Sequence, residues 1–408
     1  MPSSEKRSAD PLTTGERVKW QREKRGLRRR AVAELVGRSE EWLRLLEVEG
    51  RGAERLPNLI DIARALGMSD ASMLVGFDLR PSNAGRTPEH PAVAEVRLAL
   101  SRSLLSPPGG GPSCTLDSLS DRVRHAWAAW RISRVQYTAL GAVLPSLLVD
   151  AVGLARSAPE EERRDAHKLL AHVYLLAQRF AFCVGAPSLA TRCTDRALLA
   201  AGGAEEPELL ALAGWASAMT SLAAGHPGEA AEIALCAGEH VAVPRTPRQA
   251  ALRGSLLLFA AMGAARVCCP ADAWRHWDEA AAIAERLRHD YQHPQTQFCG
   301  ANVAVYGVAL EVETGNACAA TDRAARLDPS EIPSSNRRAQ HFIDVARGHQ
   351  QAGRAGQVLP ALLSSAGESH ETILYSSDAR ELVLALVRTS KAGETPQLVE
   401  LARALGIA

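Results

Sequence analysis

Side chains that can contact nucleic acid gather in one short segment near the amino terminus. Guanidinium groups bind phosphate oxygens and, in the major groove of DNA, the edge of guanine, whereas a glutamate accepts a hydrogen bond from cytosine. A serine in the same segment can cap the helix that carries these groups. The candidate DNA-binding residues are Arg28, Arg29, Arg30, Arg38, Ser39, Glu40, Glu41 and Arg44.

Each of these residue types favours a particular contact. The turn Arg28-Arg29-Arg30 opens a predicted helix and is expected to meet phosphates. Arg44 is expected to pair with guanine, and Glu41 to accept from cytosine. The alternatives are that the three arginines form a solvated charged turn and that Glu40 and Glu41 stabilise the first turn of their own helix through its dipole. Adjacent carboxylates near phosphates cost affinity unless they take specific donors, so both interpretations stay open.

The residues around this segment predict short helices joined by tight turns. Over residues 15–67, apolar residues recur at helical spacing in blocks that end at a glycine or begin at a capping residue. A turn at Gly37 with Ser39 as N-cap predicts a recognition helix from about Ser39 to Val48, steeply inclined to the helix before it. Its buried face is predicted to be Trp42, Leu43 and Leu46. We predict a five-helix helix-turn-helix domain over residues 13–79, with its last helix at Asp70–Val75.

The residues quoted above resemble the helix-turn-helix of the XRE (phage repressor-like) family of regulators, in the form common in high-GC Gram-positive bacteria. Later segments resemble the carboxy-terminal half of those regulators. These segments are Arg134–Leu140, Leu170–Gln178, Phe298–Asn316 and Arg337–Arg347. The resemblance covers nearly the whole chain and implies a DNA reader followed by tetratricopeptide-like helix pairs. The chain departs from the family at Glu41 and Arg44, where small or hydroxylic residues are commoner, and at Val48-Glu49, where the family usually has a basic residue and glycine.

The resemblance also implies partners. Family members dimerise, so that two recognition helices lie about 34 Å apart on a two-fold site. We therefore expect a homodimer bound to double-stranded DNA at an inverted-repeat operator. The carboxy-terminal array is expected to dimerise, to sense a peptide or small-molecule effector, or both. An alternative from another class is a protein-interaction scaffold with a vestigial DNA module, whose partner would be another regulator or RNA polymerase.

Composition sets further bounds. The 408 residues are rich in Ala, Leu, Arg and Glu, with 4% aromatic residues, which favours an all-α fold. The net charge of +1 confines any phosphate-binding surface to one segment. The eight cysteines form no C-x-x-C pair, and the longest apolar run, Leu256–Ala265, is far below the roughly 20 residues of a membrane span. The first residues are polar and charged, so no signal peptide is expected. We expect a cytoplasmic protein without membrane contact, cofactor or enzymatic activity.

From residue 116 onward the pattern is helix after helix. Residues 80–115 are predicted as a linker containing one helix, Ala92–Leu105, and residues 116–408 as a tetratricopeptide-like α-superhelix. Helix pairs are predicted at 209–224 with 229–240, 250–267 with 271–289, 297–314 with 317–327, and 335–351 with 357–366. Their turns recur about every 40 residues, and such units stack into a superhelix with a concave surface.

Polar residues on the first helices of these pairs are candidate effector ligands. Asn302 and Tyr306 lie one turn apart, and Arg338, His341 and Asp344 follow at three-residue spacing on the next first helix. The alternatives are that Asn302 caps or bridges neighbouring helices and that Arg338 and Asp344 form an internal salt bridge. His289 and His293 have the i, i+4 spacing of metal ligands, but Pro294 follows and no glutamate accompanies them, so no metal site is predicted.

Overall fold

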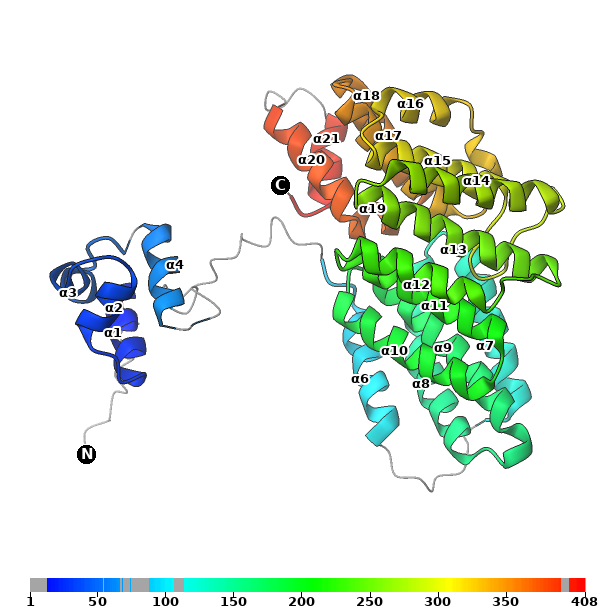
Figure 1. The fold of residues 1–408 in the computed structure, drawn as a ribbon, viewed down its shortest axis with the longest axis horizontal. Coiled ribbons are helices and arrows are strands. Elements are labelled where there is room, and N and C mark those ends of the chain that lie inside the picture. Colours follow the sequence, from blue (N-terminus) through cyan, green and yellow to red (C-terminus); the bar gives the residue numbers. More distant parts are fainter. Residues whose placement is uncertain are drawn as a thin grey trace, which may run out of the picture. The chain divides into compact units, whose positions relative to one another are not determined.

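The computed structural model of the chain describes residues 13–53, 55–66, 68, 74, 88–105, 114–389 and 396–407. All regular structure in these residues is helical and none is strand, so the predicted all-α class is confirmed. The chain divides into two compact units, Met1–Arg86 and Thr87–Ala408 (Figure 1).

The first unit contains α1 (Thr14–Lys24), α2 (Arg29–Leu35), α3 (Glu40–Glu49) and α4 (Leu56–Ala65). A capping box begins α1: the Glu16 amide donates to the Thr13 hydroxyl at 3.3 Å, and the Thr13 amide donates to the Glu16 carboxylate at 2.7 Å. Of the predicted helix Asp70–Val75, only Leu74 is described. Leu74 is helical and fully buried in the core of this unit, and the rest of that prediction lies outside the described residues.

The connection from α2 to α3 has the tight turn that the sequence predicts. Gly37 adopts φ +65°, a left-handed conformation that costs other residues energy, and the Arg38 amide closes the end of α2 by donating to the Ala33 carbonyl at 2.8 Å. The Ser39 hydroxyl accepts from the Trp42 amide at 3.1 Å. The turn at Gly37 and the N-cap at Ser39 are therefore confirmed. On α3, Leu43 and Leu46 are fully buried as predicted, and Trp42 is half-buried.

The second unit is a long succession of helices in which neighbours along the chain pack on one another. Its described helices are α6 (Ala92–Leu105), α7 (Leu116–Ile132), α8 (Gln136–Ser157), α9 (Arg163–Cys183), α10 (Pro187–Ala204), α11 (Pro207–Ala223), α12 (Pro227–Glu239), α13 (Pro247–Arg266), α14 (Pro270–Arg286), α15 (Gly300–Glu313), α16 (Ala317–Ala325), α17 (Ser335–Gln351), α18 (Ala355–Glu368), α19 (His370–Tyr375), α20 (Ser377–Thr389) and α21 (Pro396–Ala404). The four predicted helix pairs correspond to α11–α12, α13–α14, α15–α16 and α17–α18. This packing is that of a helical repeat array.

The same turn joins the two helices of five successive pairs. Its residues in the left-handed region are Gly185, Gly225, Cys268, Gly315 and Gly353, with φ between +60° and +86°. After each of them, the next amide donates to a carbonyl five residues earlier, as in Ala186 to Ala181 and Cys269 to Ala264. Four of the five positions are glycine because a side chain is strained there. Cys268 occupies the glycine position of its pair.

Small residues let the paired helices approach closely. A Cβ on Gly214 of α11 would lie 2.3 Å from the Cβ of Ala237 on α12, and one on Gly254 of α13 would lie 2.2 Å from the ring of Phe298. Ala230 and Ala280, in second helices of pairs, are fully buried. The alanine-rich composition of the array is therefore a consequence of its interhelical distances.

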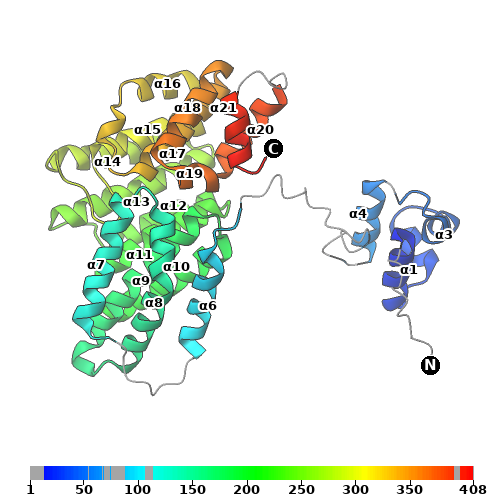
Figure 2. The same ribbon diagram turned by 180° about the vertical axis from the view of Figure 1, so that it is seen from behind.

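The helix α6 belongs to the core of the second unit, whereas the sequence analysis placed it in a linker. Val93, Val96 and Leu100 on α6 are fully buried in the same apolar cluster as the residues of α8 and α9. Figures 1 and 2 both show α6 alongside α8. The proline- and glycine-containing sequences on either side of α6 are typical of linkers and led to the wrong assignment. Burial of the apolar face of α6 stabilises its packing against the array.

One described helix, α8, is long and apolar enough to span a membrane by length and composition alone. Within the unit it buries one face: Leu144, Leu147 and Leu148 are almost fully buried against α6, α7 and α9, whereas Val143 and Val149 on the other face are exposed. Its first turn is capped by a distant residue. The buried Glu371 carboxylate of α19 accepts from the amides of Tyr137 at 2.7 Å and Thr138 at 2.9 Å. This contact ties the end of the array to its beginning.

Candidate functional site

A buried carboxylate fixes the arrangement of the first three helices. Glu47 of α3 accepts from Arg22 of α1 at 2.5 and 3.0 Å and from Arg29 of α2 at 2.7 Å. The Glu47 side chain is 0% exposed and that of Arg22 is 7% exposed. Burial raises the pKa of Glu47, but hydrogen bonds and charges from the two arginines outweigh it, so the pKa is lower than usual. Glu47 is therefore ionised at neutral pH. Through its ion pairs it holds α1 and the start of α2 to α3.

The candidate phosphate-binding arginines have different environments. Arg29 is the most constrained, since it is bound to Glu47 and its side chain is 32% exposed. Arg30 is exposed and pairs with Glu34 on the next turn of α2 at 2.8 Å. Arg28 is exposed at the N-cap position of α2, where no side chain caps the helix. Arg28 and the uncapped first amides of α2 are thus the groups best placed to meet an anion.

The exposed side of α3 carries the remaining candidates. Arg38 is exposed and its guanidinium lies 5.5 Å from the centre of the Trp42 ring. Glu40 is exposed in the first turn. Arg44 and Glu41 form a two-pronged ion pair, with N–O distances of 2.8 and 2.7 Å. Arg44 and Glu41 thus neutralise each other on the surface where the sequence predicts base contacts.

Inside the array, aromatic and cationic side chains form a row across successive first helices. The row consists of Trp130, Arg179, Trp215, Phe259 and Tyr306, whose ring or guanidinium centres follow one another at 5.0–6.0 Å. Arg179 lies between the two tryptophan rings, which is a favourable cation–π arrangement. Burial lowers the pKa of Arg179.

Asn302 and Tyr306, two of the candidate effector ligands, lie at the end of this row. The guanidinium of Arg337 lies 4.3 Å from the Tyr306 ring centre, and its Nε donates to Asn302 Oδ1 at 2.7 Å. Asn302 is buried and connects α15 to α17 through this bond. The structure thus brings both residues into an interhelical contact, which is the alternative considered for Asn302.

The other three effector candidates are also engaged within the array. Arg338 donates to Glu368 at 2.6 Å and to the Ile332 carbonyl at 2.9 Å, so the salt bridge considered between Arg338 and Asp344 does not form. His341 and Asp344 are buried. Burial, and secondarily the charge of Arg337, lowers the pKa of His341 to about 4. Burial raises the pKa of Asp344 to about 6, although Arg347 lies 3.7 Å away.

The two histidines with metal-like spacing do not share a site. His289 is exposed, whereas His293 is buried and its Nδ1 accepts from the amides of Gln295 and Thr296. In the part of the chain that the structure describes, no cluster of three or more metal-ligating side chains occurs. His293 instead orders the loop before α15.

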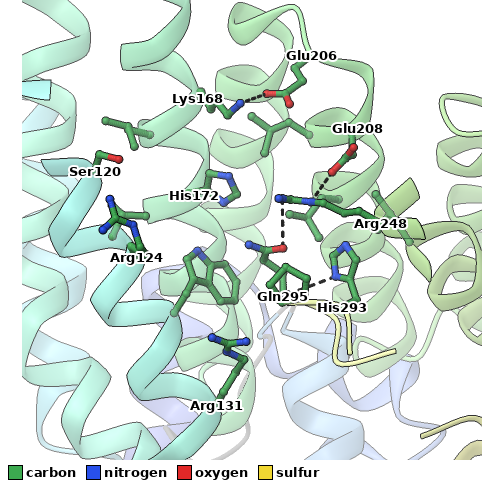
Figure 3. A pocket seen from close by; sticks show the side chains of 17 residues that line it. Ser120, Arg124, Arg131, Lys168, His172, Glu206, Glu208, Arg248, His293 and Gln295 are labelled. Carbon is green, nitrogen blue, oxygen red and sulfur yellow. Dashed lines mark hydrogen bonds and ion pairs between the residues drawn. The ribbon is translucent and has the colours of Figure 1, made fainter. Parts of the chain in front are cut away.

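A cavity of about 360 Å³ was not predicted from the sequence. Its lining comes from α7, α9, α11, α13 and the loop containing His293 (Figure 3). Several buried polar atoms in this lining have no hydrogen-bond partner among the described residues. Because these residues are spread over more than 170 positions of sequence, no local motif indicated them.

Comparison of the chain with protein-family models, with curated proteins and with solved structures finds no match.

Proposed function

We propose that the chain is a sequence-specific, DNA-binding transcriptional regulator of the XRE kind. In this proposal the first unit is a phage repressor-like helix-turn-helix domain, and the second is a tetratricopeptide-like superhelix that dimerises, senses an effector, or both. The chain acts as a cytoplasmic homodimer on an inverted-repeat operator, with its two recognition helices about 34 Å apart.

The observation that supports this proposal best is the α2–α3 pair. The glycine turn and serine cap set the angle between the helices, and the ion pairs of Glu47 fix it. A rigid angle is needed if one helix is to enter a groove while the other meets the backbone. Arg44 and Glu41 then lie on the outward side of α3, Arg38 lies in the turn before it, and Arg28 stands at the start of α2.

The test is a fluorescence-anisotropy titration of the full chain with the DNA upstream of its own gene, over a series of salt concentrations. We expect tight binding that weakens steeply with salt and exceeds binding to a scrambled fragment. Arg28→Ala should weaken binding to all sequences and reduce the salt slope by about 1. Arg64→Ala is the matched control, because Arg64 is an exposed, paired arginine on α4. Equal, weak binding to both fragments by the wild-type chain would count against the proposal.

The second candidate is a protein-interaction scaffold with a vestigial DNA module. It is favoured by the carboxylates that pair with Arg29, Arg30 and Arg44, since they reduce the cationic character of the surface. Replacing both Arg38 and Arg44 with alanine separates the two functions. If the chain is a regulator, the double variant should lose its affinity for the operator. If it is a scaffold, the variant should bind its protein partner, such as RNA polymerase, as tightly as wild type and show unchanged affinity for DNA.

A further inference from the structure

The cavity in Figure 3 is built from five separate segments that meet inside the second unit. From α7 come Ser120, Val123, Arg124, Trp127 and Arg131. From α9 come Lys168, Leu169 and His172; from α11 and the residue before it come Glu206, Glu208, Leu209 and Leu212. Arg248 and Leu252 of α13 and residues 293–295 complete the lining. The volume of about 360 Å³ is within the usual range of small-molecule sites.

Unsatisfied polar atoms concentrate in this lining. Trp127 Nε1, Arg131 Nε, His172 Nδ1 and His293 Nε2 are buried and have no hydrogen-bond partner among the described residues. Buried polar groups are normally paired, so four in one lining need an explanation. Trp127 and His172 are neighbours, with ring centres 6.3 Å apart.

At least three of these four atoms are hydrogen-bond donors. The indole Nε1 of Trp127 and the guanidinium of Arg131 can only donate. In His293, Nδ1 accepts from two backbone amides at 3.3 and 3.1 Å, so the proton of the neutral ring must be on Nε2. Burial, and secondarily the charge of Arg248, lowers the pKa of His293 to about 3, so the ring is neutral at physiological pH. The unsatisfied groups of the lining are therefore mostly donors, which a ligand with acceptor atoms would pair.

The charges around the cavity are also unbalanced. The carboxylate of Glu206 is paired with Lys168 at 2.8 Å, and that of Glu208 is paired with Arg248 at 2.5 Å. Figure 3 shows Arg248 and His172 facing each other, with Gln295 beside them. Arg131 has no carboxylate partner among the described residues. A lining with its acids already paired and one cation left over is complementary to an anion.

The remaining walls are apolar. Val123, Trp127, Leu209, Leu212 and Leu252 line the cavity with little exposure to solvent. The space corresponds to about twelve water molecules at roughly 30 Å³ each, enough for one aromatic ring with a short acidic side chain. Apolar walls with a few donors are the usual composition of a site for a small organic molecule.

We propose that this cavity binds a small organic anion, whose carboxylate or phosphate oxygens accept from Arg131, Trp127 and His293 and whose apolar body packs against the leucines. This proposal deepens the effector role in the proposed function and rests on that function only for its effect on DNA binding. The site differs from the residues that the sequence suggested, since none of the five effector candidates lines it.

The test is isothermal titration calorimetry of the full chain with phenylacetate, phenyl phosphate and the neutral isostere phenylacetamide. We expect at least one of the two anions to bind at least tenfold more tightly than the amide, because only an anion gains the ion pair with Arg131. Binding by phenylacetate alone would identify a carboxylate ligand, and binding by phenyl phosphate alone a phosphate ester. The proposal is overturned if neither anion binds below about 10 mM, or if anion and amide bind equally.

Two variants locate the binding site. Arg131→Gln should remove the preference for the anion and leave amide binding unchanged, which also shows that the cavity is intact. Arg134→Gln, a change of an exposed arginine outside the lining, should behave as wild type. Ser120→Trp should fill the cavity and abolish binding of both compounds. Wild-type binding by both Arg131→Gln and Ser120→Trp would place the ligand elsewhere and refute the proposal.

The calorimetry contains no DNA, so its result is independent of the operator titration. An anion that binds in the cavity of a chain without operator affinity would support the site and contradict the proposed function. A chain that binds the operator but binds no anion in its cavity would support the proposed function and contradict the site. Where both bind, the anion is expected to change operator affinity, because a ligand that contacts α7, α9, α11 and α13 together favours one arrangement of the array.

Discussion

Replacing Glu47 with glutamine should loosen the first unit without affecting the second. The substitution keeps the shape of the side chain but removes the charge that Arg22 and Arg29 share, and the buried Arg22 is left with only the exposed Glu23 carboxylate, 3.3 Å away. Breaking a buried ion pair costs about 3–5 kcal/mol, and the retained amide oxygen favours the lower end. A loss of about 3 kcal/mol corresponds to an opening equilibrium about 150-fold more favourable, at 1.36 kcal/mol per factor of ten.

Hydrogen exchange measured by mass spectrometry resolves this effect along the chain. Peptides from α1, α2 and α3 of the Glu47→Gln variant should exchange about 150-fold faster than in wild type. Peptides from α9 to α13 serve as the internal control and should not change. Glu34→Gln, which removes an exposed pair with Arg30, is the matched variant and should have little effect. Unchanged exchange in α1–α3 would refute the inference that Glu47 holds these helices together.

The same contact makes a prediction about pH. The pKa of Glu47 is lower in the folded chain than the roughly 4.3 of an unfolded glutamate, so the carboxylate stabilises the fold above that pH. The stabilisation is lost as the pH falls through the folded pKa. The exchange difference between wild type and Glu47→Gln should therefore be constant near neutrality and shrink below about pH 4. A difference that instead grew under acid would mean that the sign of the pKa shift is wrong.

Four further substitutions test the turns of the array, the packing of α1 on α3 and the cap of α8. Cys268→Gly should raise the free energy of unfolding of the second unit by about 0.5–1 kcal/mol, because Cys268 has φ +60°. Gly225→Ala at the equivalent turn should lower that free energy. A Cys268→Gly variant less stable than wild type would contradict the equivalence of the turns. Gly15→Ala should lower the stability of the first unit by about 1–3 kcal/mol and speed hydrogen exchange in α1 and α3, because the new Cβ would lie 2.4 Å from the Leu46 carbonyl oxygen. Exchange at the wild-type rate would show that the two helices separate easily. Glu371→Gln should cost about 1–2 kcal/mol and speed exchange in the first turn of α8, and protection that is unchanged there would mean that the cap contributes nothing.

Local patterns in the sequence were sufficient to predict the helix pairs and the start of α3. The turn at Gly37 and the cap at Ser39 depend on residues next to each other in the chain, and so do the glycines that end α11, α15 and α17. Such features are encoded by backbone conformation and short-range hydrogen bonds. They can be deduced without knowing which helices meet.

Features that depend on long-range contacts were not predictable in the same way. Glu47 lies within the predicted recognition helix, but its partners are 25 and 18 residues away, so its burial has no local signature. The cavity needs residues from five segments. For α6 a usable signal existed, because Val93, Val96 and Leu100 form an apolar face that a linker helix does not need. The prolines and glycines on either side of this helix are typical of linkers, and they carry no information on what the apolar face packs against.

The arginines of the first unit differ in how freely they can exchange partners, and this bears on how the domain would bind DNA. The pair between Arg44 and Glu41 is exposed, so Arg44 can leave its carboxylate for guanine at small cost, and Glu41 is then free to accept from cytosine. Arg29 leaves Glu47 only at a higher cost, because the fully buried Glu47 would lose one of its two cationic partners and keep Arg22 alone. The three adjacent arginines are therefore not equivalent: Arg29 maintains the angle between α2 and α3, while Arg28 is exposed at the start of α2 and is the arginine that we propose to meet phosphates. The acidic residues of α3 are thus compatible with base contact. Glu47, the carboxylate that is costly to separate from its arginines, is buried, whereas the exposed Glu41 loses its partner at small cost.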